Sequence, residues 1–93
     1  MTKRQIVMKI SEETNIKQID VRKAVQRTLD IITDSIVAGN TVELRNFGVF
    51  KVKQRRARLG RNPRSGVAVQ VPPRRVAVFK PGLVLKKRLR AQA

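Results

Sequence analysis

The sequence contains no cysteine, histidine, tryptophan or tyrosine. Without cysteine there is no disulfide framework and no thiolate metal site. The lack of histidine removes the commonest acid–base catalyst and metal ligand. Three phenylalanines are the only aromatic residues, so a base-stacking platform for single strands is not expected. We therefore expect neither a metal nor a cofactor, and a protein that is not an enzyme.

Long apolar runs are also missing. No stretch approaches the roughly 20 apolar residues of a membrane span, and the N-terminus, MTKRQIVMKI, lacks the apolar core of a secretory signal. These two features predict a cytoplasmic protein with no membrane partner. With 93 residues, the chain is expected to form a single domain over 1–93.

Acidic residues are confined to the first part of the chain. Residues 1–43 hold all six acids against seven Lys and Arg, a net charge of +1, whereas residues 44–93 hold fifteen Lys and Arg and no acid, a net charge of +15. A polycation of this kind points to a polyanionic partner, most often nucleic acid. An anionic membrane is the weaker alternative, because no basic amphipathic helix carries most of the charge.

The apolar periodicity predicts an α+β fold. Steps of three and four residues predict helices over 2–14 and 18–38, and a shorter helix over 83–90. Between them, alternation predicts strands over 41–44, 49–58 and 74–79, in a three-stranded antiparallel sheet. A long hairpin arm, at about 53–76, protrudes between the last two strands. The expected organisation is a helical base over 1–40, the sheet with its arm over 41–82, and a helix and tail over 83–93.

Helix 18–38 carries an apolar stripe that is too wide for the single short helix before it to cover. This excess indicates a second copy of the chain. The three phenylalanines are expected in the core or the subunit interface rather than against a ligand. The candidate dimer-core residues are Leu29, Ile32, Ile36, Leu44, Phe47, Phe50 and Phe79.

The arm is the strongest functional feature. Its arginines are Arg55, Arg56, Arg58, Arg61, Arg64, Arg74 and Arg75. A two-stranded ribbon fits a DNA groove, and guanidinium groups suit phosphates and narrow minor grooves. A charged, unstructured loop is the alternative, against which the alternating valines at 67, 69 and 71 argue. Pro63 at the tip either sets the backbone angle of a turn or acts as an apolar wedge between base pairs.

One set of residues through the second half matches a known pattern: Phe47, Gly48, Phe50, Arg55, Arg58, Gly60, Arg61, Asn62, Pro63, Gly66, Phe79, Pro81, Gly82 and Lys86. With these residues the chain resembles the bacterial histone-like HU and integration host factor (IHF) proteins over essentially its whole length. There are departures from that pattern. Asn46 stands where the family usually has glycine, and Leu83 stands where many HU proteins have lysine.

The resemblance implies an intertwined dimer whose two arms lie in the minor groove of DNA, with the proline at each tip intercalated. Pro63 would then be the wedge. The residues lining the arm would be Arg55, Arg58, Arg61 and Asn62, and those gripping phosphates beside the body would be Lys3, Lys80 and Lys86. A homodimer is expected, although a heterodimer with a related subunit is an alternative.

The predicted function is that of an architectural protein of the nucleoid, which bends, wraps and compacts double-stranded DNA mostly without sequence specificity. A sequence-specific, IHF-like protein is the first alternative. A basic RNA-binding or ribosomal protein is the second, and A-form RNA disfavours it because its major groove is too narrow for a ribbon. A structural, self-assembling protein is the third.

Overall fold

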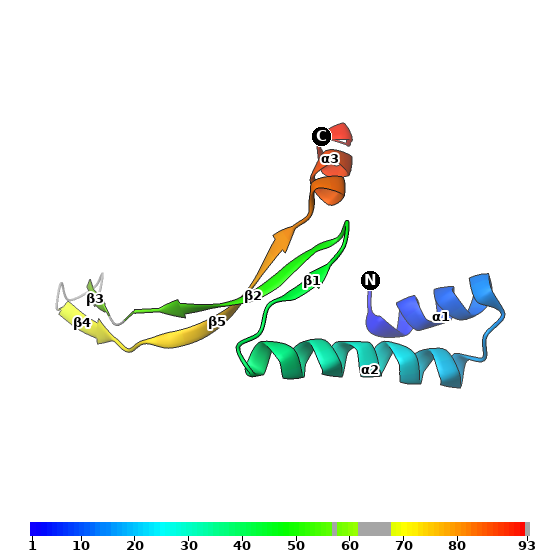
Figure 1. Cartoon of the computed structure of the whole chain (residues 1–93), viewed down its shortest axis with the longest axis horizontal. Coiled ribbons are helices and arrows are strands. Elements are labelled where there is room, and N and C mark those ends of the chain that lie inside the picture. Colours follow the sequence, from blue (N-terminus) through cyan, green and yellow to red (C-terminus); the bar gives the residue numbers. More distant parts are fainter. Residues whose placement is uncertain (57, 62–67, 93) are drawn as a thin grey trace. The chain divides into compact units, whose positions relative to one another are not determined.

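The computed structural model describes residues 1–56, 58–61 and 68–92, and it describes the side chains of 1–56 and 72–92. The chain forms two compact units, Met1–Ser35 and Ile36–Ala93. The division lies a few residues before the boundary at 40 and 41 expected from the sequence. The elements are α1 (Lys3–Thr14), α2 (Gln18–Val37), β1 (Val42–Leu44), β2 (Gly48–Arg55), β3 (Arg58–Arg61), β4 (Ala68–Val71), β5 (Arg74–Pro81) and α3 (Leu83–Ala91) (Figure 1).

Helix α1 begins with a capping box. The Thr2 side chain accepts a hydrogen bond from the backbone N–H of Gln5, and the Gln5 side chain accepts one from the backbone N–H of Thr2. Both bonds satisfy amides that would otherwise have no partner in the first turn. The helix ends at Asn15, whose φ of 58° lies in the left-handed region that asparagine tolerates. A connection of three residues, Asn15–Lys17, then leads into α2.

Helix α2 is followed closely by a glycine that ends it. Gly39 adopts a φ of 87°, and its N–H donates to the carbonyl oxygen of Ile36 over 2.9 Å. Glycine enters this conformation without the steric cost that a β-carbon would impose. The chain is thereby turned out of the helix and into β1.

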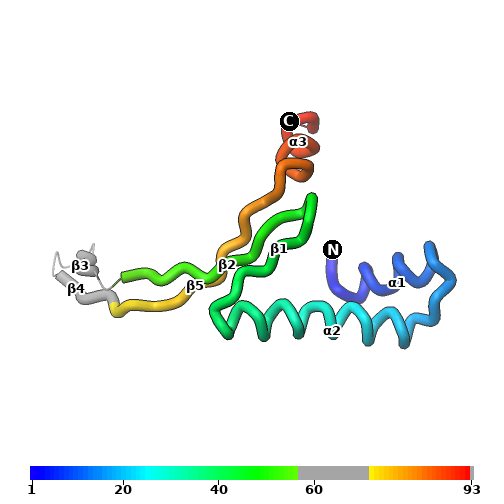
Figure 2. The backbone as a smooth tube through the Cα atoms, viewed as in Figure 1, coloured from blue at the N-terminus to red at the C-terminus, as the bar shows by residue number. Residues whose placement is uncertain are grey.

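The three-stranded antiparallel sheet is confirmed, with β2 in the centre between β1 and β5. Figure 2 traces the tight connection between β1 and β2. In that turn Asn46 has a φ of 67°, so asparagine serves where glycine is usual, and the Phe47 N–H donates to the Leu44 carbonyl over 3.0 Å. Helix α3 follows β5 through Gly82, which gives the α+β fold its predicted element order.

The predicted continuous strand over 49–58 is wrong. Pairing of β2 with β5 stops at Arg55 opposite Arg74, and a separate two-stranded ladder joins β3 to β4 from Arg58 opposite Val71. Pro72 and Pro73 lie between β4 and β5. Proline has no N–H to donate to a ladder, so two in succession interrupt the pairing. The β2–β5 pair of the sheet therefore ends at Arg55 and Arg74, which we call the root of the arm, and a separate outer ribbon, β3–β4, follows it.

The isolated chain buries few of its apolar side chains. Among the described residues, the buried hydrophobic side chains are those of Val7 and Val21, one on each helix of the first unit. Phe47 is 50% exposed and Phe79 is 38% exposed. So little burial cannot offset the conformational entropy of folding in a chain of this length. None of the helices in the described part of the chain is both long enough and apolar enough to span a membrane.

Candidate nucleic-acid interface

Strand alternation separates the side chains of the three-stranded sheet into two faces, because directly paired residues of antiparallel strands lie on the same face. One face, called here the cationic face, contains five basic residues and one acid, Glu43 of β1. Valines at 49, 76 and 78 lie between the charges. The basic residues are Lys51, Lys53, Arg55, Arg74 and Lys80.

The opposite face, called here the apolar face, contains Val42, Leu44, Phe50, Val52 and Phe79. The Phe50 and Phe79 rings are paired across the strands with centroids 4.9 Å apart, and Phe47 extends the cluster at 5.3 Å from Phe79. Both spacings are typical of favourable aromatic pairs.

Gly48 is what allows the aromatic cluster to close. A β-carbon on Gly48 would lie 2.4 Å from a ring carbon of Phe79 and 2.6 Å from the Lys80 carbonyl oxygen. No such contact is sterically possible, so the Phe79 ring occupies the space that a side chain at 48 would fill. A β-carbon on Gly82 would lie 3.2 Å from the Phe47 carbonyl, and the Gly82 N–H donates to that carbonyl over 2.8 Å. The two glycines fix the β1–β2 turn against the start of α3.

The root of the arm concentrates like charges. Arg55 and Arg74 are directly opposite each other in the β2–β5 register, an arrangement that destabilises a sheet when no counter-ion is present. A hollow of about 480 Å³ at this position is lined by Gln54, Arg55, Arg56, Pro73, Arg74 and Arg75, with no acid among them. This combination favours a bound anion.

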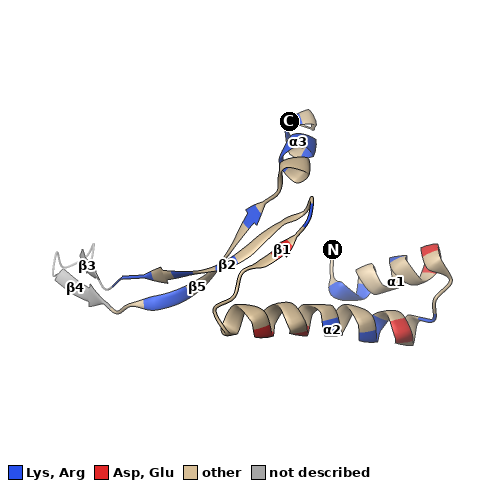
Figure 3. Cartoon of the chain, viewed as in Figure 1, with Lys and Arg blue, Asp and Glu red and all other residues tan. Residues whose placement is uncertain are grey.

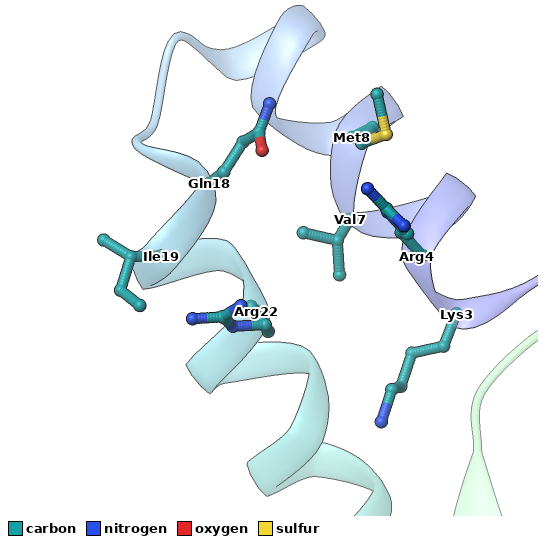
Figure 4. Close-up of a pocket in the computed structure, with 7 residues that line it drawn as sticks. All are labelled: Lys3, Arg4, Val7, Met8, Gln18, Ile19 and Arg22. Carbon is teal, nitrogen blue, oxygen red and sulfur yellow. The ribbon is translucent and has the colours of Figure 1, made fainter.

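A second group of cations lies on the helical unit. A hollow of about 630 Å³ between α1 and α2 is lined by Lys3, Arg4 and Arg22 together with Gln18 and the apolar Val7, Met8 and Ile19 (Figure 4). Lys3 is exposed, and its Nζ donates to the side-chain oxygen of Gln26 on α2. The bond holds the predicted phosphate-gripping lysine against α2, at the surface.

Helix α3 supplies the third group. Its N-cap is Gly82, which provides no side-chain cap, and the Lys86 N–H donates to the Gly82 carbonyl over 3.0 Å. The exposed basic residues of this helix are Lys86, Lys87, Arg88 and Arg90. Figure 3 shows basic residues along β2, β5 and α3, whereas acidic residues occur on α1, α2 and β1.

The structure places the predicted DNA-binding residues in different positions. Arg55, Arg74 and Lys80 share the cationic face, and Arg56 follows directly after β2. Arg75 lies on the opposite face, where its Nη2 donates to the carbonyl oxygen of Val37 over 3.1 Å. Arg58 and Arg61 are the terminal residues of β3. Three predicted residues lie outside the described part of the chain: Asn62, Pro63 and Arg64.

Sequence reasoning missed Lys51 and Lys53. Both share the cationic face with Arg55, and Lys53 is exposed. The signal was present, since residues 51, 53 and 55 alternate with the uncharged residues Phe50, Val52 and Gln54. The prediction rested instead on the arginines nearer the tip of the arm.

Comparisons with known proteins show the family and the fold. A family model described as bacterial DNA-binding protein matches residues 1–90. The chain is 38% identical over 89 residues to the integration host factor subunit alpha of Caulobacter sp. (strain K31), covering 96% of this chain and 89% of the relative. It is 40% identical over 84 residues to that of Rhodopseudomonas palustris (strain BisA53), covering 90% and 74%. The fold is similar to that of the Anabaena HU–DNA cocrystal structure, with a TM-score of 0.85, 27% identity and coverage of 96% and 97%.

Proposed function

Since the chain belongs to the bacterial DNA-binding protein family, of the HU and IHF type, we propose that it is an architectural protein of the nucleoid that bends and compacts double-stranded DNA without catalysing a reaction. Proteins of this family bind double-stranded DNA and form dimers. One of the similar structures is a complex of an HU protein with DNA.

The observation that carries the proposal is the cationic face of the sheet. Arg55 and Arg74 are paired side by side, and Lys51, Lys53 and Lys80 extend the row along the same ribbon. A DNA backbone carries a dense, regular series of negative charges, so a row of cations on one face binds it with release of counter-ions. The interface is proposed to begin at this face and to continue along the outer ribbon β3–β4.

The second element of the proposal is a dimer formed by two copies of the chain. The isolated chain leaves Phe47 and Phe79 partly exposed, and α3 leaves Leu83 and Leu89 more than half exposed. A partner that covers these side chains would complete the core. The candidate dimer-core residues remain Leu29, Ile32, Ile36, Leu44, Phe47, Phe50 and Phe79, and a homodimer is the simplest assembly.

Pro63 is proposed as the wedge at the end of the outer ribbon. A rigid apolar ring between two base pairs unstacks them at a cost of about a few kcal/mol, which the extra contacts of a bent duplex offset. Asn62 and the arginines at 58, 61 and 64 would hold the strained duplex. This part of the proposal rests on the sequence resemblance, because residues 62–64 lie outside the described part of the chain.

The direct test is competitive binding to a labelled duplex at several salt concentrations. We expect log affinity to fall with log salt at about −0.9 per phosphate contacted, so by several units for a dimer, and we expect unlabelled duplex DNA to compete better than duplex RNA. An affinity that does not respond to salt would exclude the phosphate-binding role. Equal competition by RNA would favour the RNA-binding alternative.

A second test addresses bending. Pro63→Ala keeps every arginine, so it should retain most of the affinity for a straight duplex but lose bending, as measured by the fluorescence end-to-end distance of a short duplex at saturating protein. Arg61→Ala is the matched control, which should weaken binding and retain the bend at saturation. If Pro63→Ala bends the duplex as sharply as the parent, the proline is a turn residue and the kink belongs elsewhere.

A further inference from the structure

Arg74 and Arg75 are adjacent in the sequence but do not lie on the same face of β5. Arg74 is paired with Arg55 on the cationic face, whereas Arg75 is paired with Gln54 on the opposite face. Successive strand residues point to opposite sides of a sheet, so the two side chains leave β5 in opposite directions although both border the hollow at the root of the arm. The contacts of each arginine therefore have to be considered separately.

The partner of Arg75 is the end of helix α2. Nη2 of Arg75 donates to the carbonyl oxygen of Val37, the last residue of the helix, over 3.1 Å. The same Nη2 lies 3.7 Å from the position that a β-carbon on Gly39 would take. The guanidinium group thus lies against residues 37–39, at the end of α2 and the start of its connection to β1 (Figure 1).

The end of α2 lacks a cation of its own. Its last turn contains no basic residue and includes Asp34, whose negative charge is unfavourable near the negative end of the helix dipole. The last carbonyls of a helix have no partner within the helix, and a basic side chain can satisfy them and offset the dipole at once. Gly39 N–H satisfies the Ile36 carbonyl, and Arg75 satisfies that of Val37.

We propose that Arg75 is a positioning residue that ties the root of the arm to the end of α2, and that it does not itself contact phosphate. By holding β5 against residues 37–39, Arg75 fixes the orientation of the cationic face at Arg55 and Arg74. The inference rests on the proposed DNA-binding function, since its consequence is a correctly oriented row of cations. It also assigns opposite roles to two adjacent arginines.

The test compares Arg75→Ala with Arg74→Ala, two substitutions that remove the same charge from neighbouring positions. Arg75→Ala should lower the melting temperature of the DNA-free protein by about 2–8 °C, because a charged cap at a helix end is lost. At a temperature where it is fully folded, it should lower DNA affinity several-fold at every salt concentration, with an unchanged slope. Arg74→Ala should leave the melting temperature unchanged or raise it, and make the slope shallower by about 1.8 for the two copies in a homodimer.

Arg75→Lys is a second variant in case the alanine variant does not fold. It keeps the charge and loses the guanidinium fork, so it should fall between the parent and alanine in melting temperature and affinity, at the parent's slope. A shallower slope with an unchanged melting temperature would identify Arg75 as a phosphate contact and overturn the proposal. A lower melting temperature with unchanged affinity would make Arg75 a cap without a positioning role. If the parent itself does not bind DNA, the proposed function fails first.

Discussion

The two faces of the three-stranded sheet differ in almost every respect although the same strands build them. The cationic face presents Lys51, Lys53 and Arg55 from β2, whereas the apolar face presents Phe50 and Val52 from the same strand. Because the side chains of a strand alternate with a period of two, one short strand supplies both faces. In the proposed function, the cationic face binds nucleic acid and the apolar face packs against a second copy of the chain.

Phe79→Ala would break the apolar face and should have the largest effect. Phe79 contacts both other phenylalanines, and a partner chain is proposed to cover its exposed edge. Loss of a covered phenylalanine ring costs about 3–5 kcal/mol. We expect the variant to be unfolded at micromolar concentration, where the parent is a folded dimer, as measured by sedimentation and by the concentration dependence of the melting temperature. A stable folded monomer, in the parent or in this variant, would contradict our expectation that the chain folds only as a dimer.

Gly48→Ala tests the same face by adding rather than removing an atom. The new β-carbon would lie 2.4 Å from the Phe79 ring, which must move away from its pairing with Phe50. Overpacking of this kind costs about 1–3 kcal/mol. Thermal unfolding should show a lower midpoint than the parent. Gly39→Asn is the comparison variant, because its β-carbon would meet only an ordinary contact at 3.7 Å and its cost comes from the positive φ, which asparagine tolerates better than other residues with a side chain. Its loss should be smaller than that of Gly48→Ala, and an equal loss in both variants would refute the packing explanation.

Lys53→Gln tests whether the two faces have different roles, since it removes one charge from the cationic face and leaves the apolar face unchanged. The slope of log affinity against log salt should become shallower by about 1.8 for the two copies in a homodimer, with little change in melting temperature. Gln54→Ala, the next residue on the opposite face, is the matched control and should leave the slope unchanged. The face assignment fails if the two variants exchange these results.

Glu43→Gln should have the smallest effect and the opposite sign. Glu43 is the one acid on the cationic face, paired with Val49. Glu43 and the DNA phosphates are both negative, so removing the carboxylate should tighten DNA binding slightly at low salt. The difference in affinity between variant and parent should disappear at higher salt, which screens the repulsion. The measurement is the affinity for one duplex at low and moderate salt. Weaker binding by this variant would mean that Glu43 makes a favourable contact with DNA.

Much of the fold followed from local signals. The capping box at Thr2 and Gln5, the glycine stop at Gly39 and the tolerance of Asn46 for a positive φ were readable because each depends on residues close in sequence. The α+β order followed from the change of apolar period near residue 40. The break in the arm was also encoded locally, by Pro72 and Pro73, although we predicted a continuous strand over 49–58.

The sequence alone determined the charge asymmetry, the element order and the family, because composition, period and motif are properties of the chain. The tertiary structure decided which cations share one face of the sheet. Lys51, Lys53 and Arg55 alternate on β2, and the β2–β5 register adds Arg74 and Lys80 to the same face. The register also places Arg74 and Arg75 on opposite faces. The hydrogen bond from Arg75 to Val37 joins residues 38 positions apart in the chain, so no local pattern reveals it. Strand register and long-range contacts are fixed by packing, and packing is not visible in a local pattern.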